Sequence, residues 1–185
     1  MITMLNFRNF AKTDLAHVLV RRKPGQKTRA IVQAGPLRLQ AAIGRSGITS
    51  LKREGDGATP RATMRMLNGF FRADSHSMIK TRLPLQSIRS DMLWCDAPQH
   101  PAYNRPVKAP FKPSHERMMR NDRLYDVCLV MDWNIKTRKR GGGSAIFFHV
   151  ARTDYGPTEG CIAICLADMR RLLPFLSRKT VVTVL

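Results

Sequence analysis

Short hydrophobic runs, separated by clusters of Gly, Pro, Asn and Asp, follow one another along the whole chain. Several of them alternate apolar and polar positions, which is the period of a half-buried β-strand. The pattern predicts nine strands, at His17–Arg21, Ala30–Ala34, Leu37–Ile43, Thr63–Leu67, Met92–Cys95, Val127–Trp133, Ala145–Val150, Cys161–Ile164 and Thr180–Leu185. Many short strands with turn signals between them predict a mainly-β domain, built as a sandwich or barrel.

One segment has helical rather than strand periodicity. Leucine and methionine residues recur at three- and four-residue steps through 166–176, which predicts a helix that Pro174 ends or kinks. Glu116–Arg123 is a candidate for a second short helix. Five prolines make Pro98–Pro113 an extended loop, and three glycines make Lys136–Gly143 another. The expected architecture is therefore β-rich with one or two short helices.

Length and composition fit one globular domain, because the chain has 185 residues and 43% of them are hydrophobic. The longest apolar stretch without a charge, Gly141–Ala151, is shorter than the roughly 20 residues of a membrane-spanning helix. We therefore expect no transmembrane segment. Met1–Arg22 also lacks the apolar core of about 7–15 residues that marks an export signal.

The formal net charge is +19, spread as +8 over residues 1–60, +7 over 61–120 and +4 over 121–185. This balance favours a negatively charged partner, such as nucleic acid, anionic lipid or an acidic wall polymer, although high charge also serves solubility. A tight basic cluster at Lys136–Arg140 would suit phosphates. Aromatic residues make up only 7% and none interleaves with that cluster, so we expect no specific nucleic acid partner.

Four cysteines are present, and no two of them form a C-x-x-C pair, so no zinc ribbon is indicated. Cys95 and Cys128 are interpreted as core residues, with a bridge between them left open. Cys165 is interpreted as buried filler. No metal site and no organic cofactor are implied.

The segment Ser144–Ile164 carries the candidate chemistry. His149 lies near the end of an apolar run. A polar loop follows, and a second apolar run begins at Cys161. A histidine within hydrogen-bond reach can activate a cysteine thiol as a nucleophile. Gly160 lets backbone approach a substrate carbonyl, so the amides of Gly160 and Cys161 are candidates for an oxyanion hole. Taken alone, the spacing also fits a buried structural cysteine beside a core histidine.

This segment resembles the active-site signature of the L,D-transpeptidase catalytic domain family (YkuD-like), in which a strand-ending His precedes Ser/Thr-x-Gly-Cys. The residues that match are His149, Thr158, Gly160, Cys161 and Ile162. The chain departs from many members at Ala163, where they have Arg, and at Glu159, where they have His. The departures bear on donor-peptide contacts more than on the nucleophile.

The resemblance extends beyond the motif. Ile43–Gly47 and Lys52–Pro60 are similar to an early hairpin and a G-D-G-x-T-P turn of the family. Trp94–Asp96, Tyr103–Arg105 and Leu124–Asp126 are similar to segments of a compact proteobacterial branch. We expect a catalytic domain over residues 15–185, preceded by an N-terminal extension at residues 1–14.

The resemblance implies a β-sandwich that cross-links peptidoglycan stem peptides in the periplasm or cell wall. Cys161 would form a thioester with a donor stem, His149 would move the proton, and a second stem would complete a 3-3 or a 1-3 cross-link. The carbonyl of Val150 would orient the imidazole, while Gly160 and Glu159 supply backbone around the oxyanion. Carbapenem β-lactams would be inhibitors.

The remaining site assignments concern the substrate. We expect His100, Tyr103 and Asn104 to form the cleft wall, with Thr158 as a further contact. The Glu159 carboxylate either approaches an amine of the substrate or is solvated. Two rival functions stay open, namely a carboxypeptidase or other hydrolase on the same site, and a basic module that binds nucleic acid or an anionic surface.

Overall fold

The computed structural model describes residues 15–74 and 80–185, so the predicted N-terminal extension at residues 1–14 lies outside the described residues. The strands within the described ranges are β1 (His17–Arg22), β2 (Arg29–Ala34), β3 (Leu37–Ala42), β4 (Ile48–Thr49), β5 (Thr59–Pro60), β6 (Thr63–Phe71), β7 (Leu85–Ser87), β8 (Met92–Cys95), β9 (Arg105–Lys108), β10 (His115–Arg117), β11 (Val127–Met131), β12 (Phe147–Val150), β13 (Ile162–Ile164) and β14 (Val181–Val184). All nine predicted strands are present, and the prediction of a mainly-β fold is confirmed.

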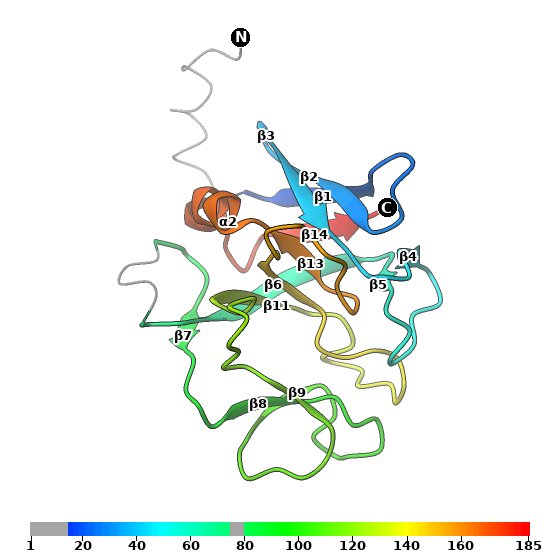
Figure 1. Cartoon of the computed structure of the whole chain (residues 1–185), viewed down its shortest axis with the longest axis vertical. Helices are drawn as coiled ribbons and strands as arrows, with labels where there is room; N and C mark the ends of the chain where they lie inside the picture. The colour runs from blue at the N-terminus through cyan, green and yellow to red at the C-terminus, as the bar shows by residue number, and fades with distance from the viewer. Residues whose placement is uncertain (1–14, 75–79) are drawn as a thin grey trace.

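Most of the strands form one large sheet, the main sheet, in the order β11-β12-β13-β3-β2-β1-β14-β6-β7. β6 also pairs with β11, the first strand of that order, so the sheet closes on itself. Figure 1 shows β1, β2 and β3 at one end of the molecule, with β6 and β11 crossing its middle. The closure gives the main sheet an inner face and an outer face.

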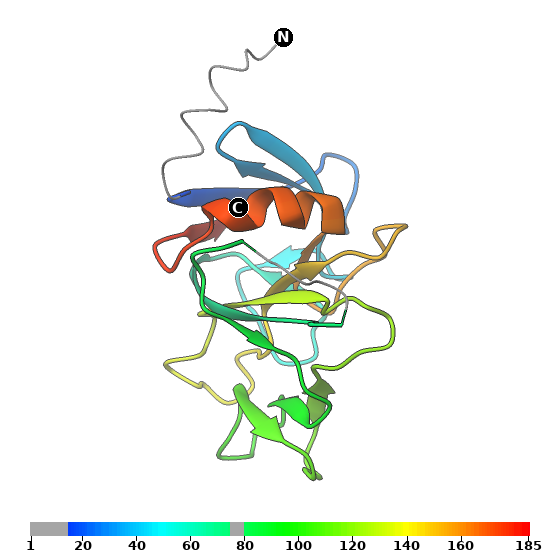
Figure 2. The same ribbon diagram turned by 90° about the vertical axis from the view of Figure 1, so that its left-hand side faces the viewer.

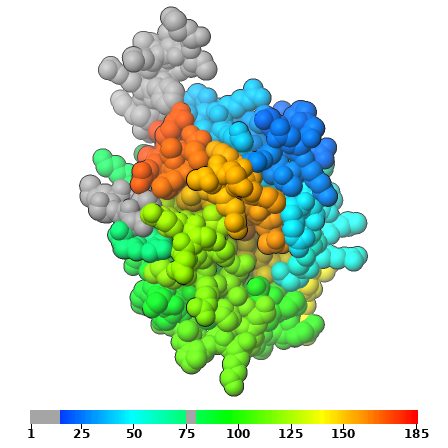
Figure 3. All heavy atoms as spheres, viewed as in Figure 1, coloured from blue at the N-terminus to red at the C-terminus, as the bar shows by residue number. Residues whose placement is uncertain are grey.

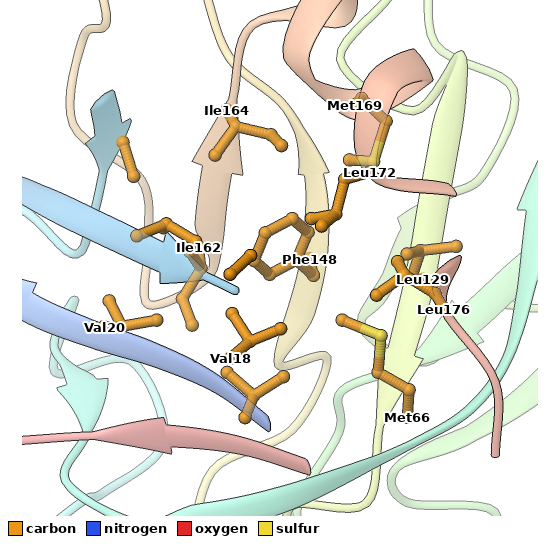
Figure 4. Close-up of a cluster of buried hydrophobic side chains, with 14 of the residues drawn as sticks. Val18, Val20, Met66, Leu129, Phe148, Ile162, Ile164, Met169, Leu172 and Leu176 are labelled. Carbon is orange, nitrogen blue, oxygen red and sulfur yellow. The ribbon is translucent and has the colours of Figure 1, made fainter. Parts of the chain in front are cut away.

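The inner face holds the larger hydrophobic core. β1 shows why, because Val18 and Val20 are fully buried while their neighbours in the strand are more exposed. This alternation places one side of each strand in the core. Figure 4 shows Phe148 and Ile162 of β12 and β13 among these side chains, close to Met66 and Leu129.

The helical prediction over 166–176 is correct, because α2 (Leu166–Leu172) runs into a 3₁₀ turn, η1 (Leu173–Phe175). Pro174 lies inside the 3₁₀ turn, where the α-helix has already ended. Met169 and Leu172 are fully buried and pack against the inner core beside Phe148 (Figure 4). The helix thereby closes the core on one side.

Three strands, β8, β9 and β10, form a second sheet, the small sheet, in the order β10-β8-β9. It lies at the end of the molecule opposite β1–β3 (Figures 1 and 2). A second apolar cluster joins the small sheet to the outer face of the main sheet, with Trp94 edge-on to Phe147 at 5.1 Å between ring centroids. The layer between the two sheets is where the candidate site forms.

Two local predictions are wrong. Glu116–Arg123 is not a helix, because Glu116 pairs with Trp94 of β8 and the following residues turn. Pro98–Pro113 is not one continuous loop, because β9 lies within it and pairs with β8. In both cases pairing with a distant strand decides the local conformation.

Candidate active site

The catalytic candidates lie on neighbouring parallel strands of the main sheet. β12 pairs with β13, with Phe148 opposite Ile162 and His149 opposite Ala163. Since side chains alternate between faces, Phe148 and Ile162 enter the inner core while His149 and the side chain preceding β13, Cys161, belong to the outer face. His149 and Cys161 line the same cavity.

The Cys161 thiol is buried, with 7% of the residue exposed. Its Sγ donates to the Ala145 carbonyl at 3.2 Å and accepts from the Phe147 N–H at 3.4 Å. Burial raises the pKa of this thiol to about 12, although the Phe147 N–H favours the thiolate. In this resting arrangement the thiol is therefore protonated at neutral pH.

The His149 imidazole is also buried, with 4% of the residue exposed. Burial lowers its pKa to about 4, so the ring is neutral at pH 7. Its Nδ1 lies 2.9 Å from the Val150 carbonyl oxygen. Because a carbonyl only accepts, Nδ1 carries the proton and Nε2 keeps its lone pair. A neutral histidine in this tautomer is equipped to accept a proton.

The loop before Cys161 is held by its own polar groups. Thr158 Oγ1 donates to the Cys161 carbonyl at 2.7 Å and accepts from the Gly160 N–H at 3.2 Å. The Arg45 N–H donates to the Thr158 carbonyl at 2.8 Å, which fastens the loop to the chain that follows β3. The Gly160 N–H thus already has a partner, and the Thr158 hydroxyl fixes the loop as well as lining the cavity.

Gly160 has a positive φ of 135°, a region that side chains rarely adopt. A Cβ at this position would lie 2.8 Å from the Ala58 carbonyl oxygen. Only glycine therefore lets the loop lie this close to residue 58. This close approach ties the loop before Cys161 to the G-D-G-x-T-P turn.

That turn, Gly55–Pro60, is built around Asp56. Its carboxylate accepts from the Arg53 N–H at 2.8 Å and the Ala58 N–H at 2.9 Å, and it pairs with Lys52 at 2.5 Å. Burial acts to raise the pKa of Asp56, but these partners outweigh it and lower the pKa. The turn ends at Thr59, whose Oγ1 donates to the Cys161 carbonyl at 3.4 Å. Two motifs about 100 residues apart therefore meet at Cys161.

The cavity has a volume of about 320 Å³. Segments around residues 115–125 and 150–160 lie side by side on the face seen in Figure 3, and both contribute to its wall. The lining residues are Glu54, Gly55, Asp96, Glu116, Arg120, Leu124, Tyr125, Ser144, Ala145, His149, Arg152, Gly156, Pro157, Thr158, Glu159, Cys161 and Ala163. The cavity thus places the thiol and the imidazole among polar and charged groups.

The expected wall residues lie elsewhere. Tyr103 is 2% exposed and its hydroxyl donates to Glu54 at 2.5 Å, while Asn104 is fully buried. Asn104 Oδ1 accepts from the Ala145 N–H at 3.1 Å, and Ala145 is the residue whose carbonyl holds the thiol. The His100 ring accepts from the backbone at residue 102. None of the three lines the cavity, so Tyr103 and Asn104 support it from behind.

The wall that sequence reasoning missed comes from Glu116, Arg120 and Tyr125. Tyr125 sets its ring edge-on to His149 at 5.3 Å between centroids, and its hydroxyl donates to Glu116 at 3.2 Å. The Arg120 guanidinium lies over the Tyr125 ring at 4.9 Å and contacts Glu116 at 3.3 Å. Burial raises the pKa of Glu116. The Leu124–Asp126 resemblance was the available signal, but nothing in the sequence placed it beside His149.

The structure also shows the surroundings of Glu159 and the state of the cysteines. The Glu159 carboxylate pairs with Arg45 at 2.8 Å and is largely exposed at the edge of the cavity. All four cysteines are free thiols, including Cys95 and Cys128. Within residues 15–74 and 80–185, no group of His, Cys, Asp and Glu side chains could hold a metal ion.

A comparison with known protein families identifies the family of this chain. The family model for the L,D-transpeptidase catalytic domain (YkuD) matches residues 16–184, which is nearly the whole chain. The chain therefore belongs to the L,D-transpeptidase catalytic domain family, whose enzymes act on peptidoglycan stem peptides. No curated protein and no solved structure gives a significant match. Among the described residues no helix has the length and apolarity to cross a membrane.

Proposed function

We propose that this chain is a peptidoglycan L,D-transpeptidase that forms 3-3 or 1-3 cross-links through a thioester on Cys161. The observation that carries the proposal is the pairing, in one cavity, of a buried thiol with a neutral histidine whose Nδ1 faces the Val150 carbonyl. Family membership supports acyl transfer as the type of reaction. The proposed place of action is the periplasm or cell wall.

The first half of the proposed reaction acylates the enzyme. A donor stem enters the cavity, and the Cys161 thiol turns from the Ala145 carbonyl toward Nε2 of His149. The thiol proton passes to Nε2 while Sγ forms a bond to the carbonyl carbon of the L,D-peptide bond. The carbon–nitrogen bond then breaks, and the imidazolium returns the proton to the departing amine. The products are a thioester and a free D-amino acid or peptide.

The second half of the reaction releases the product. The amine of a second stem attacks the thioester carbon and loses a proton to His149. The carbon–sulfur bond breaks, and the proton returns to the Cys161 sulfur. Water in place of the amine would give a carboxypeptidase. The neutral resting state suits this sequence, because the same imidazole must accept and donate a proton in each half.

The deciding experiment is a mass-resolved analysis of products. Wild-type protein, Cys161→Ala and Cys165→Ala would each be incubated with defined disaccharide tetrapeptide and tripeptide muropeptides. Cys165 is the matched control, because its thiol donates to Asp168 beside α2 and does not line the cavity. We expect cross-linked dimers from wild type and Cys165→Ala and none from Cys161→Ala.

Other outcomes assign the site differently. Shortened monomers without dimers would contradict transpeptidation and identify a carboxypeptidase. Unchanged muropeptides with all three proteins would contradict both the transpeptidase and the carboxypeptidase function and favour a basic binding module. Fragmentation of a dimer would identify the cross-linked residues and thus separate a 3-3 from a 1-3 bond.

A further inference from the structure

The layer between the two sheets opens at a second place, away from the catalytic cavity. Two cavities of about 490 and 440 Å³ lie there between β6 and the small sheet. Both are lined by Asn68, Phe70 and Pro106, so they adjoin along β6 and β9. We call this pair of adjoining cavities the cationic groove. It shares no lining residue with the catalytic cavity.

The floor of the cationic groove is apolar. Phe70 of β6 and Met92 and Trp94 of β8 form its base and are almost fully buried. The apolar lining residues that keep some exposure are Leu67, Val107 and Ile135. The β8–β9 register sets Pro106 opposite Trp94 and Lys108 opposite Met92, so these four side chains share one face of the small sheet. The groove therefore has an apolar base with β9 along one side.

The rim of the groove carries only positive charge. Its charged lining residues are Arg65, Arg89, Arg105, Lys108 and Arg178, and neither cavity is lined by an Asp or a Glu. The Arg89 guanidinium pairs with Asp91 at 3.3 Å. The catalytic cavity differs, because it is lined by carboxylates as well as by arginines. Among the described lining residues, the positive charge of such a rim is not balanced by a carboxylate inside the groove, so the rim attracts anions.

The backbone at the groove is also open to a partner. All four residues of β9 line the groove, and among the described strands β9 pairs only with β8. An outer strand can accept an added strand, but Pro106 has no N–H, so β9 offers fewer donors than an ordinary edge strand. Along β6, the five residue steps from Arg65 to Phe70 span about 17 Å at a rise of about 3.4 Å per residue. The groove is thus long enough for five or six residues of extended peptide.

We propose that the cationic groove binds an extended acidic segment of a partner protein, in which acidic and apolar residues alternate. Successive side chains of an extended peptide point in opposite directions. One set can then enter the apolar floor while the other reaches the arginines and Lys108. A highly charged polymer without apolar groups would leave the floor uncovered, which is why a peptide is the better match.

Trp94 provides a direct reporter for the occupant. Its ring lines the groove, and its Nε1 donates to Asn104 Oδ1 at 3.0 Å. Asn104 Oδ1 also accepts from Ala145, whose carbonyl holds the Cys161 thiol. Trp94 is 3% exposed, so an occupant of the groove lies beside a buried residue that is linked through Asn104 and Ala145 to Cys161. We expect tryptophan emission to change when the groove is filled.

The test uses a defined probe, a fluorescein-labelled octapeptide of alternating Glu and Val, in about 0.15 M NaCl, where exposed charges are screened beyond roughly 8 Å. Binding would be measured by fluorescence anisotropy, and tryptophan emission would be followed with the unlabelled peptide. The groove variant is the double substitution Arg65→Glu with Arg105→Glu. The control is Arg22→Glu with Arg38→Glu, which changes the net charge equally at two exposed arginines of β1 and β3.

We expect the groove variant to bind the peptide at least tenfold more weakly than wild type, and the control to stay within twofold. An octapeptide of Glu alone should bind at least tenfold more weakly than the alternating peptide. Equal losses in both variants, or tighter binding of the all-Glu peptide, would reduce the effect to the general charge of the protein and overturn the proposal. Absence of binding at millimolar peptide would overturn it as well. Circular dichroism of each variant confirms that losses are not due to unfolding.

Discussion

His149 and Cys161 rest as a neutral pair. Burial lowers the pKa of the imidazole to about 4 and raises that of the thiol to about 12, so neither group is charged at pH 7. An imidazolium–thiolate pair is therefore not the resting state. In the proposed reaction, the charge forms when a substrate enters and the thiol leaves the Ala145 carbonyl. This separates the site from cysteine enzymes whose thiolate exists before substrate arrives.

The buried histidine makes stability depend on pH. An unfolded histidine takes up its proton near pH 6.5, whereas folded His149 does so only near pH 4. Acidification from about 6.5 to about 4 therefore favours the unfolded chain, and the contribution lost amounts to about 3 kcal/mol at most. Urea unfolding at pH 7 and pH 4.5 should show a smaller pH-dependent loss in His149→Gln than in wild type. Equal losses in the two proteins would contradict the burial of a neutral imidazole.

Thr158 gives a second prediction at the same scale. Thr158→Val keeps the shape of the side chain but removes the hydroxyl that bridges Gly160 and Cys161. The Gly160 N–H then loses this partner and the Cys161 carbonyl keeps only the longer contact with Thr59, which should cost about 1–3 kcal/mol of unfolding free energy. We expect kcat for cross-linking to fall more than KM rises, since the loop that carries the nucleophile loosens. Thr63→Val is the control, because Thr63 is exposed and its hydroxyl bonds to Thr183 on the sheet, away from the cavity. A loss of kcat in the control as large as that in Thr158→Val would refute a local role.

At the scale of elements, the nucleophile loop depends on the turn at 55–60. Gly160→Ala would place a Cβ 2.8 Å from the Ala58 carbonyl oxygen at a φ of 135°. We expect destabilisation of about 1–3 kcal/mol and a roughly hundredfold loss of cross-linking activity, because small displacements of reacting groups are costly. Gly25→Ala is the control, with a φ of 72° and no atom within 4 Å of the added Cβ. Full activity in Gly160→Ala would show that the loop can shift without harm.

The sequence predicted the strands and the helix whose hydrophobic pattern is visible within the element itself. The strands that alternate apolar and polar residues, and the helix with Leu and Met at helical steps, were all foreseen. β9 and β10 were not, because they exist through pairing with β8 rather than through their own pattern. The same reason explains the error at Glu116–Arg123. Tyr103 was expected in the cleft wall, but its hydroxyl bonds to Glu54 and the residue does not line the cavity.

At the scale of the whole molecule, the site forms because the small sheet covers the outer face of the main sheet. The residues that carry the proposed chemistry come from the main sheet, and the missed wall comes from β10 and the turn after it. The sequence located the first set through a motif. For the second set it offered the Leu124–Asp126 resemblance but no indication of its place beside His149, because the position of the small sheet depends on contacts such as Trp94 against Phe147.

The charge of the whole molecule predicts how it associates with a wall polymer. With a net charge of +19, the protein should bind isolated, anionic peptidoglycan sacculi at low salt. About 0.5 M NaCl should release most of it in a sedimentation assay, because exposed charges are then screened within a few ångströms. Cys161→Ala should bind as well as wild type, since the thiol contributes no surface charge. Retention at high salt would contradict an electrostatic association.

The most direct test of the central claim, a nucleophilic Cys161, is intact-protein mass spectrometry after incubation with a carbapenem. Wild type and Cys165→Ala should each gain the mass of one carbapenem molecule, and proteolytic mapping should place it on Cys161. Cys161→Ala should stay unmodified, and His149→Gln should react far more slowly than wild type. An adduct that persists in Cys161→Ala, or an adduct mapped to another cysteine in wild type, would contradict the account.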